Sequence, residues 1–514
     1  MVLKWQSLYI RGLQLEPNLN LNFHLNSLPA PSCGMEGFCY LKIPMADFDL
    51  KDTILTRLGE NYDLHDKYVN RTLVKVQRTI GFDKVYARAE GAYLYDLDGK
   101  DYLDFLSGYS VFNIGRNHPT VQKAIRDVLE LDLPNMVQMD CSVLSGLLAE
   151  ALAKKLAPRD ACFLCNSGTE SVEGALKFAR AYTKRPRILA QEGSYHGLSF
   201  GALSITHSGN FREDFGPFLP GADFVKFGDI DDLEKKLRSK DVAAFIFEPV
   251  QGKGVKYPKD DYFPAAQELC RKYGTLFIAD EVQTALGRTG KWFGFQHWNL
   301  DPDIVTLAKA LSGGYVPCAA IVMRRPIYQG IFSRLDRCVA HSTTFGRNNL
   351  AMACGLASLH ITEQEHLVEN AALRGEQLMS KLRALQEKHD VIDEVRGKGL
   401  MIAIEFKEPK SLKLKLAWKA IHAMDKGLFP QMIVTPLLQK HRILSQVAAH
   451  NSDIVKILPP LIIGEKEIDR FVNAFDDVLS DLGKFPGPLW DFGQNLVKTA
   501  LSQKKNFRSE AVPA

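Results

Sequence analysis

The hydrophobic pattern between about residues 160 and 310 alternates short apolar runs with helical segments. The runs at residues 245–247, 276–279 and 304–308 are almost entirely apolar, as expected of strands that are buried on both faces of a sheet. Strands that alternate with helices in this way usually form parallel sheets. The pattern therefore predicts an α/β fold with a doubly wound, mostly parallel β-sheet.

Regular patterns also flank this region. Residues 91–105 alternate apolar and polar positions around a turn at Asp98 and Gly99, which predicts a β-hairpin. Towards the C-terminus, helical patterns at 368–389, 414–426 and 466–482 surround a strand at 400–406, which predicts a smaller α+β domain. We therefore expect a poorly ordered extension (1–44), an N-terminal segment (45–94), a large domain (95–361), a small C-terminal domain (362–483) and a tail (484–514).

The composition narrows the classes of function. A chain of 514 residues with 46% hydrophobic residues can bury a large core, and its net charge of +4 is too small to indicate a nucleic-acid partner. No apolar stretch approaches the length of a membrane-spanning helix, so we expect no membrane partner. The nine cysteines form no disulfide framework, which indicates a reducing compartment: the cytoplasm, with the mitochondrial matrix as the alternative.

Two of the cysteines, Cys162 and Cys165, make a CxxC motif that has no second pair elsewhere in the chain. Metal sites and redox sites both use this spacing, but a structural metal site normally needs four ligands. We interpret the motif as a buried strand that enters a loop, and we predict no metal site.

Charged side chains follow three of the apolar runs directly. Glu248 follows the first run, Asp280 the second and Lys309 the third. Open α/β sheets place their sites at the carboxyl ends of parallel strands. A lysine amine can form an imine with an aldehyde cofactor, and a carboxylate beside a pyridine nitrogen is what pyridoxal 5′-phosphate (PLP) requires. The alternative is a solvated lysine and an unrelated acidic turn.

Two turns in the same region offer further binding groups. The segment 165–171 joins a strand to a helix through small residues, so its backbone N–H groups and the hydroxyls of Ser167 and Thr169 can bind an anion. An ordinary helix cap would use the same residues. The turn 193–197 contains Tyr195, whose flat ring could cover a cofactor ring, although a tyrosine in the core is the common alternative.

Six motifs together resemble a known family. CNSGTES, GSYHG, FEPVQG, IADEVQTALGRTG, LAKALSGG and HSTTFGRNN occur in this order between residues 165 and 349. In order and spacing they resemble the class III PLP-dependent aminotransferases, the group of the ornithine, acetylornithine, 4-aminobutyrate and putrescine enzymes. The resemblance extends from about residue 68 to about 480. It implies PLP fold type I, a PLP cofactor, and transamination between an amine or ω-amino acid and a 2-oxo acid.

The resemblance also implies roles for the residues that bind the cofactor. Lys309 matches the lysine that holds PLP as a Schiff base and then moves a proton, and Asp280 matches the acid that pairs with the pyridine nitrogen. These two are the expected catalytic residues. The remaining cofactor contacts are expected from the phosphate-binding turn, the stacking tyrosine, the neighbouring strand ends and a threonine that reaches the phosphate of a second subunit: Ser167, Gly168, Thr169, Tyr195, His196, Glu248, Gln283 and Thr344.

Two residues are implied for the substrates, and the threonine implies an assembly. Arg396 resembles the arginine that binds the carboxylate of glutamate or 2-oxoglutarate, and Tyr109 matches a substrate-side tyrosine. Because Thr344 would serve a neighbouring subunit, the resemblance implies a homodimer that shares its sites across the interface.

The sequence departs from the family at two places that bear on the substrate. Lys253 stands where the ornithine and acetylornithine enzymes have a glutamate that neutralises the arginine, so it cannot neutralise Arg396. The segment 428–456 is longer than usual and apolar, which suits either a local core or a pocket for a long apolar amine. We expect a diamine or ω-amino donor of the ornithine and putrescine type. A long-chain amine or aldehyde, or a PLP enzyme of this fold that does not transaminate, is the alternative.

Overall fold

The computed structural model describes residues 48–137, 139–423, 427–448 and 452–482. The predicted extension (1–44) and tail (484–514) lie outside the described residues. Internal contacts divide the chain into two units, Met1–Leu58 and Gly59–Ala514. In the first unit, α2 (Leu50–Arg57) begins where the carboxylate of Asp49 accepts a hydrogen bond from the backbone N–H of Asp52.

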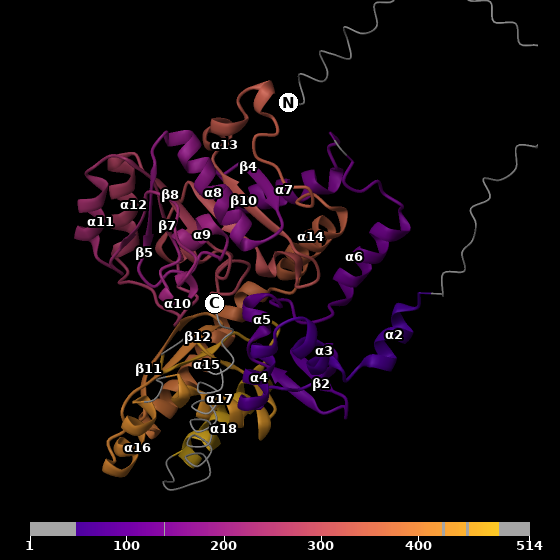
Figure 1. The fold of residues 1–514 in the computed structure, drawn as a ribbon, viewed down its shortest axis with the longest axis vertical. Helices are drawn as coiled ribbons and strands as arrows, with labels where there is room; N and C mark the ends of the chain where they lie inside the picture. The colour runs from indigo at the N-terminus through magenta and orange to yellow at the C-terminus, as the bar shows by residue number, and fades with distance from the viewer. Residues whose placement is uncertain (1–47, 138, 424–426, 449–451, 483–514) are drawn as a thin grey trace, which may run out of the picture. The chain divides into compact units, whose positions relative to one another are not determined.

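The second unit is built around a seven-stranded sheet (Figure 1). Strand β10 is antiparallel to both of its neighbours, whereas the other described strand pairs of this sheet are parallel. The predicted doubly wound, mostly parallel sheet is therefore confirmed. In spatial order its strands are β4 (Ala161–Cys165), β10 (Ala319–Met323), β9 (Ile304–Leu307), β8 (Leu276–Asp280), β7 (Val242–Phe247), β5 (Arg187–Gln191) and β6 (Ala222–Val225).

Helices cover both faces of this sheet, because successive side chains of a strand point to opposite faces. On β7, Phe245 and Phe247 belong to one buried cluster, and Ala244 and Ile246 belong to another. The first cluster includes side chains from α7 (Val143–Lys155), α11 (Ile230–Leu237), α12 (Tyr262–Tyr273) and α14 (Asn349–Gln364). The second includes side chains from α8 (Gly168–Thr183), α9 (Phe200–Ser204) and α13 (Arg325–Phe332).

Towards the C-terminus the chain forms a second, antiparallel sheet packed against helices. Its spatial order is β11 (Ile392–Lys398), β12 (Met401–Phe406), β15 (Ile454–Ile457) and β14 (Gln446–Val447). The helices are α15 (Leu367–Lys388), α16 (Leu412–His422), α17 (Leu428–Gln439) and α18 (Glu465–Leu482). The α+β pattern expected here is present, but the contacts keep this region within the unit Gly59–Ala514, so a separate small domain stays a prediction.

The N-terminal part of the second unit joins these two regions. The predicted hairpin is β2 (Tyr93–Asp96) and β3 (Asp101–Asp104), flanked by β1 (Tyr86–Glu90) and by β13 (Ile443–Leu444), which is parallel to β3. The remaining elements are α3 (Asn61–Tyr68), α4 (Arg71–Ile80), α5 (Ser107–Ser110), α6 (Pro119–Glu130), α10 (Gly209–Arg212) and the 3₁₀ turns η1 (Gly294–Trp298), η2 (Lys309–Ser312) and η3 (Leu335–Arg337).

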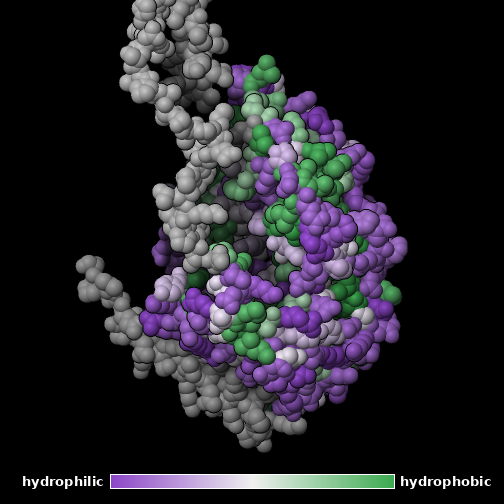
Figure 2. All heavy atoms as spheres, turned by 90° about the vertical axis from the view of Figure 1, so that its right-hand side faces the viewer, coloured by the Kyte–Doolittle hydropathy of each residue, from purple (hydrophilic) through white to green (hydrophobic). Residues whose placement is uncertain are grey.

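Large hydrophobic side chains are exposed in two neighbouring segments. Hydrogen bonds from the backbone N–H of Asn349 to Asn135 Oδ1 (3.0 Å) and from Arg347 Nη1 to the carbonyl of Asp140 (3.4 Å) hold the segments together. Figure 2 shows hydrophobic patches on the face that carries α6. We call the following set the apolar surface: Leu129, Leu131, Leu133, Met136, Val137, Met139, Leu335, Val339 and Phe345.

Candidate active site

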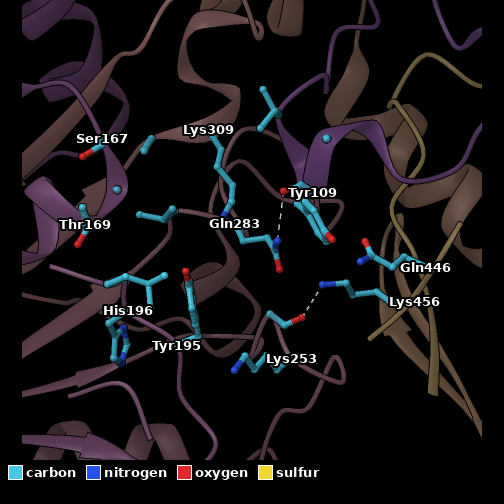
Figure 3. Close-up of a pocket in the computed structure, with 18 of the residues that line it drawn as sticks. Tyr109, Ser167, Thr169, Tyr195, His196, Lys253, Gln283, Lys309, Gln446 and Lys456 are labelled. Atoms are coloured by element: carbon cyan, nitrogen blue, oxygen red, sulfur yellow. Dashed lines mark hydrogen bonds between the residues drawn. The ribbon is translucent and has the colours of Figure 1, made fainter. Parts of the chain in front are cut away.

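A large cavity of about 1180 Å³ lies where β7, β8 and β9 end. Figure 3 shows side chains converging on it from the parallel sheet, from α8, from α5 and from the antiparallel sheet. Ten of the twelve residues expected at the site line the cavity: Tyr109, Ser167, Gly168, Thr169, Tyr195, His196, Glu248, Asp280, Gln283 and Lys309. Thr344 and Arg396 are not among the lining residues.

Lys309 follows β9 after one residue, Ala308, and begins the turn η2. Its backbone has a φ of 46°, a left-handed conformation that costs free energy for a residue with a Cβ and that often marks a functional site. Desolvation in the cavity lowers the pKa of its amine, and the nearby carboxylates of Asp280 and Glu248 oppose that shift. The amine is therefore easier to deprotonate than an exposed lysine, as a nucleophile requires.

Asp280, at the end of β8, is a carboxylate held by three donors. Its Oδ2 accepts a hydrogen bond from His196 Nδ1 (2.6 Å), and its Oδ1 accepts from Thr306 Oγ1 and from the backbone N–H of Val282 (both 3.1 Å). The second ring nitrogen of His196 is buried and has no partner among the described residues. These contacts fix the carboxylate at the floor of the cavity, where its charge can act on a bound group.

The turn that begins α8 has the geometry of an anion site. Ser167 caps the helix, since its hydroxyl accepts a hydrogen bond from the backbone N–H of Glu170 (3.3 Å). Thr169 Oγ1 lies 2.6 Å from Ser199 Oγ. Gly168 is required, because a Cβ there would lie 2.8 Å from a methyl carbon of Val282. The free N–H groups and the positive end of the 16-residue helix favour a phosphate at this place.

Glu248 links two backbone segments through hydrogen bonds to its carboxylate. Its two oxygens accept hydrogen bonds from the backbone N–H groups of Tyr195 (2.8 Å) and Gly252 (2.7 Å). Burial raises the pKa of this carboxyl. The contacts position the ring of Tyr195, which also packs edge-on against Phe211 with the ring centres 5.5 Å apart.

Gln283 and Tyr109 both line the cavity, and a hydrogen bond joins them. Gln283 Nε2 donates to the carbonyl oxygen of Tyr109 (3.2 Å), while Gln283 Oε1 is buried with no partner among the described residues. Tyr109 belongs to α5, where four consecutive residues have left-handed φ values between 44° and 68°. This unusual backbone turns the tyrosine towards the cavity (Figure 3).

The family model for class III aminotransferases matches residues 76–479. The chain belongs to the class III aminotransferases. Two curated relatives are an aminotransferase, PigE, from Serratia sp. (34% identical) and a putrescine aminotransferase from Pectobacterium atrosepticum (39% identical). The matches cover 86% and 81% of this chain, but only 56% of PigE and 87% of the putrescine enzyme.

A solved structure supports the fold assignment. The ornithine aminotransferase of Toxoplasma gondii, described as holding PLP at partial occupancy in its active site, superposes with a TM-score of 0.71 at 28% identity. The match covers 85% of this chain and 100% of that chain. The expected fold, PLP fold type I, and the expected cofactor are thereby confirmed for this enzyme.

The residues of the cavity fit PLP. The turn Ser167–Thr169 would hold the phosphate, Asp280 would face the ring nitrogen, and the unpartnered Oε1 of Gln283 and Nε2 of His196 are free for polar groups of a ligand. The ring of Tyr195 offers a flat face. When bound, PLP supplies an aldehyde that takes up an amino group and a ring that draws electrons from the reacting carbon.

Arg396 is not placed where the resemblance suggested. Its guanidinium is buried outside the cavity lining: Nη2 donates to the carbonyl of Gly254 (2.7 Å), and Nη1 forms ion pairs with Glu394 (2.6 Å) and Glu405. Two carboxylates of its own sheet therefore neutralise this arginine. Glu394 and Glu405, and not the residue at position 253, neutralise Arg396 in this structure.

Lys253 itself lines the cavity. Its amine lies 4.0 Å from the ring centre of Phe211 and 5.2 Å from that of Tyr195, which are cation–π contacts.

Thr344 lies in an exposed stretch beside Phe345, on the apolar surface. Cys162 and Cys165 lie on β4 as the strand interpretation predicted, and burial raises the pKa of the Cys162 thiol to about 12.

Sequence reasoning missed Lys456 and Gln446, which line the cavity from the antiparallel sheet (Figure 3). Lys456 is a single cation in the apolar run Ile454–Ile457, which is β15. A charge inside such a run was the available signal, because a strand that is buried on both faces rarely contains a lysine. Gln446 had no comparable signal.

Proposed function

We propose that this enzyme transfers the amino group of a terminal primary amine to a 2-oxo acid, using PLP. The observation that carries the proposal is that Lys309, Asp280 and the α8 turn share one cavity in a chain of the class III family. The relatives are named for putrescine and ornithine, which are a diamine and a diamino acid. Both names support a donor with a terminal amino group.

Each of several cavity residues would have a separate role in this reaction. Lys309 would carry the cofactor and, once its amine is released by the substrate, move a proton between the substrate carbon and its own nitrogen. Asp280 would keep a proton on the ring nitrogen, and His196 Nδ1 would keep Asp280 oriented. Glu248 would hold Tyr195 against the ring and exclude water from that side.

The volume and lining of the cavity support a second candidate donor. Val76 and Ile80 of α4 and Leu428 of α17 line it together with Val447. An alkyl chain that leaves water for such a wall gains roughly 0.8 kcal/mol for each methylene group. A long-chain amine or aldehyde is therefore the alternative substrate.

A half-reaction screen tests the proposal. The purified holoenzyme is mixed with each amine in the absence of an oxo acid, and the visible absorption of the cofactor is followed; putrescine, ornithine and alkyl amines of increasing length are compared. We expect putrescine or ornithine to bleach the absorption, and 2-oxoglutarate to restore it with formation of glutamate. Release of carbon dioxide, or product formed without an oxo acid, would contradict transamination.

We also propose that the enzyme is a homodimer in which Thr344 contacts the cofactor phosphate of the partner subunit. Thr344 does not line the cavity of its own chain, and it adjoins the apolar surface, whose burial would favour association.

The seven described cysteines are free thiols, which supports the cytoplasm or the mitochondrial matrix as the compartment. Among the residues that the structure describes, no helix is both long and apolar enough to span a bilayer.

A further inference from the structure

Lys253 is a cation on the cavity wall whose charge no carboxylate pairs with among the described residues. Its amine instead lies over two aromatic rings, 4.0 Å from the ring centre of Phe211 and 5.2 Å from that of Tyr195. Aromatic faces hold an ammonium group in place without neutralising its charge. A molecule that enters the cavity therefore meets a positive charge at this wall.

The other charged groups of the cavity do not offset this cation. Lys309 and Lys456 add two further amines. Glu248 and Asp280 are the two carboxylates among the lining residues, and both already accept hydrogen bonds from the protein. A second ammonium group brought in by a diamine would therefore meet cations and no free carboxylate, which is costly where water is excluded.

The same cavity has an apolar wall that suits an alkyl chain. Val76 and Ile80 of α4 face it together with Leu428 of α17. Thr435 Oγ1 of α17 donates a hydrogen bond to the carbonyl oxygen of Ile80 (3.1 Å), so the two helices are joined where they line the cavity. An alkyl chain gains free energy by leaving water for this wall, whereas an ammonium group at its end would lose hydration without gaining a partner.

We propose that Lys253 selects the amino donor: its charge disfavours a donor with a second ammonium group, which leaves a monoamine with an apolar chain as the better donor. The inference rests on the proposed transamination and decides between its two candidate donors. Putrescine remains a substrate, but a less efficient one than an alkyl amine of the same length. Lys253 determines specificity in this scheme, while Lys309 and Asp280 keep the catalytic roles.

A pair of amines of equal length tests this assignment. Pentylamine and putrescine have the same number of heavy atoms, and a methyl group in the first replaces the distal ammonium of the second. The rate at which each amine bleaches the holoenzyme is measured against its concentration, which separates the apparent Kd from the limiting rate. The variants are Lys253→Glu, Lys253→Met and Lys253→Arg. Lys256→Glu is the matched control, because Lys256 lies in the same loop with an exposed side chain.

We expect the wild type to prefer pentylamine over putrescine on the order of tenfold, as judged by the ratio of limiting rate to Kd. Lys253→Glu should lower this preference on the order of 10- to 100-fold, chiefly by tightening the binding of putrescine. Lys253→Met, which removes the charge without adding one, should lower it less. Lys253→Arg and Lys256→Glu should keep the preference of the wild type.

Two results would contradict the proposals, and they differ. A preference within twofold of the wild type in both Lys253→Met and Lys253→Glu, or a wild type that prefers putrescine, would overturn the role of Lys253 and leave transamination standing. A wild type that neither amine bleaches, and that forms no glutamate from 2-oxoglutarate with either of them, would overturn the proposed function and this inference with it.

The pH dependence adds a readout that a merely structural role would not move. Lys253 faces Glu248, Lys456 and the rings of Tyr195 and Phe211. Desolvation lowers the pKa of Lys253 to about 8, so its charge is present below that pH and lost above it. The preference for pentylamine should therefore fall as the pH rises from about 7 to about 9, where the distal amine of putrescine stays protonated. Lys253→Arg should reduce this fall, since an arginine stays protonated. An equal fall in Lys253→Arg would contradict the assignment.

Discussion

At the scale of single residues, Lys309 combines three unfavourable features. Its backbone is left-handed, its amine is desolvated, and it lies in a cavity that contains two further lysines. Structures retain such features where they serve a function, because each one costs free energy. Desolvation and a strained backbone together give a lysine whose amine is reactive and fixed in direction, as the attachment of an aldehyde cofactor requires.

Replacing Lys309 with alanine should abolish the visible absorption of the lysine-linked cofactor and lower kcat at least about a thousandfold, because the nucleophile and the proton carrier are both lost. Absorption spectra and steady-state rates measure the two effects. Circular dichroism should remain that of the wild type, which controls for misfolding. Turnover at the wild-type rate would exclude Lys309 as the catalytic lysine.

At the scale of elements, α5 is held in place by one buried arginine. The guanidinium of Arg288 is fully buried and donates to Ser107, to Asn113, and to the carbonyl oxygens of Leu400 and Pro459. Burial lowers the pKa of this guanidinium to about 9. A single side chain thus ties the segment that carries Tyr109 to the residues just before β12 and just after β15.

Replacing Arg288 with methionine should destabilise the enzyme by about 3 kcal/mol or more, because several buried acceptors lose their donor. The melting temperature of the holoenzyme should fall by several degrees. Arg271→Met is the control, since Arg271 lies on the exposed side of α12. If the two variants melted at the same temperature, Arg288 would not be what holds α5 in place.

At the scale of the whole molecule, the apolar surface and the position of Thr344 both bear on how the active enzyme assembles. Exposed hydrophobic side chains in neighbouring segments are typical of surfaces that associate. A twofold dimer would bury the same surface on both subunits. If Thr344 serves the partner's phosphate, neither subunit has a complete site alone.

Mixing inactive subunits tests this assembly. When Lys309→Ala and Thr344→Ala proteins exchange subunits, about half of the dimers are mixed and one of their two sites carries neither change, so activity should recover to about a quarter of the wild type. Each variant incubated alone provides the baseline. Light scattering gives the mass of the active species, and a fully active monomer would contradict the proposal.

The sequence by itself determined the parallel sheet and most of the candidate site. Apolar runs that end in a single charged residue are local signals, so they located Asp280 and Lys309 without knowledge of the fold. The phosphate-binding turn is local as well, because a strand, a short turn and a helix follow one another in the chain. All of these residues line one cavity, since parallel strands end at the same edge of a sheet.

Only the tertiary structure decided which cations line the cavity. Arg396 and Lys456 are 60 positions apart in the chain, and both lie on strands. The pairing of β11, β12 and β15 puts them in one row, and the glutamates beside Arg396 neutralise it while Lys456 has no such partner among the described residues. Strand register depends on interactions between distant segments, and neither composition nor periodicity records those interactions.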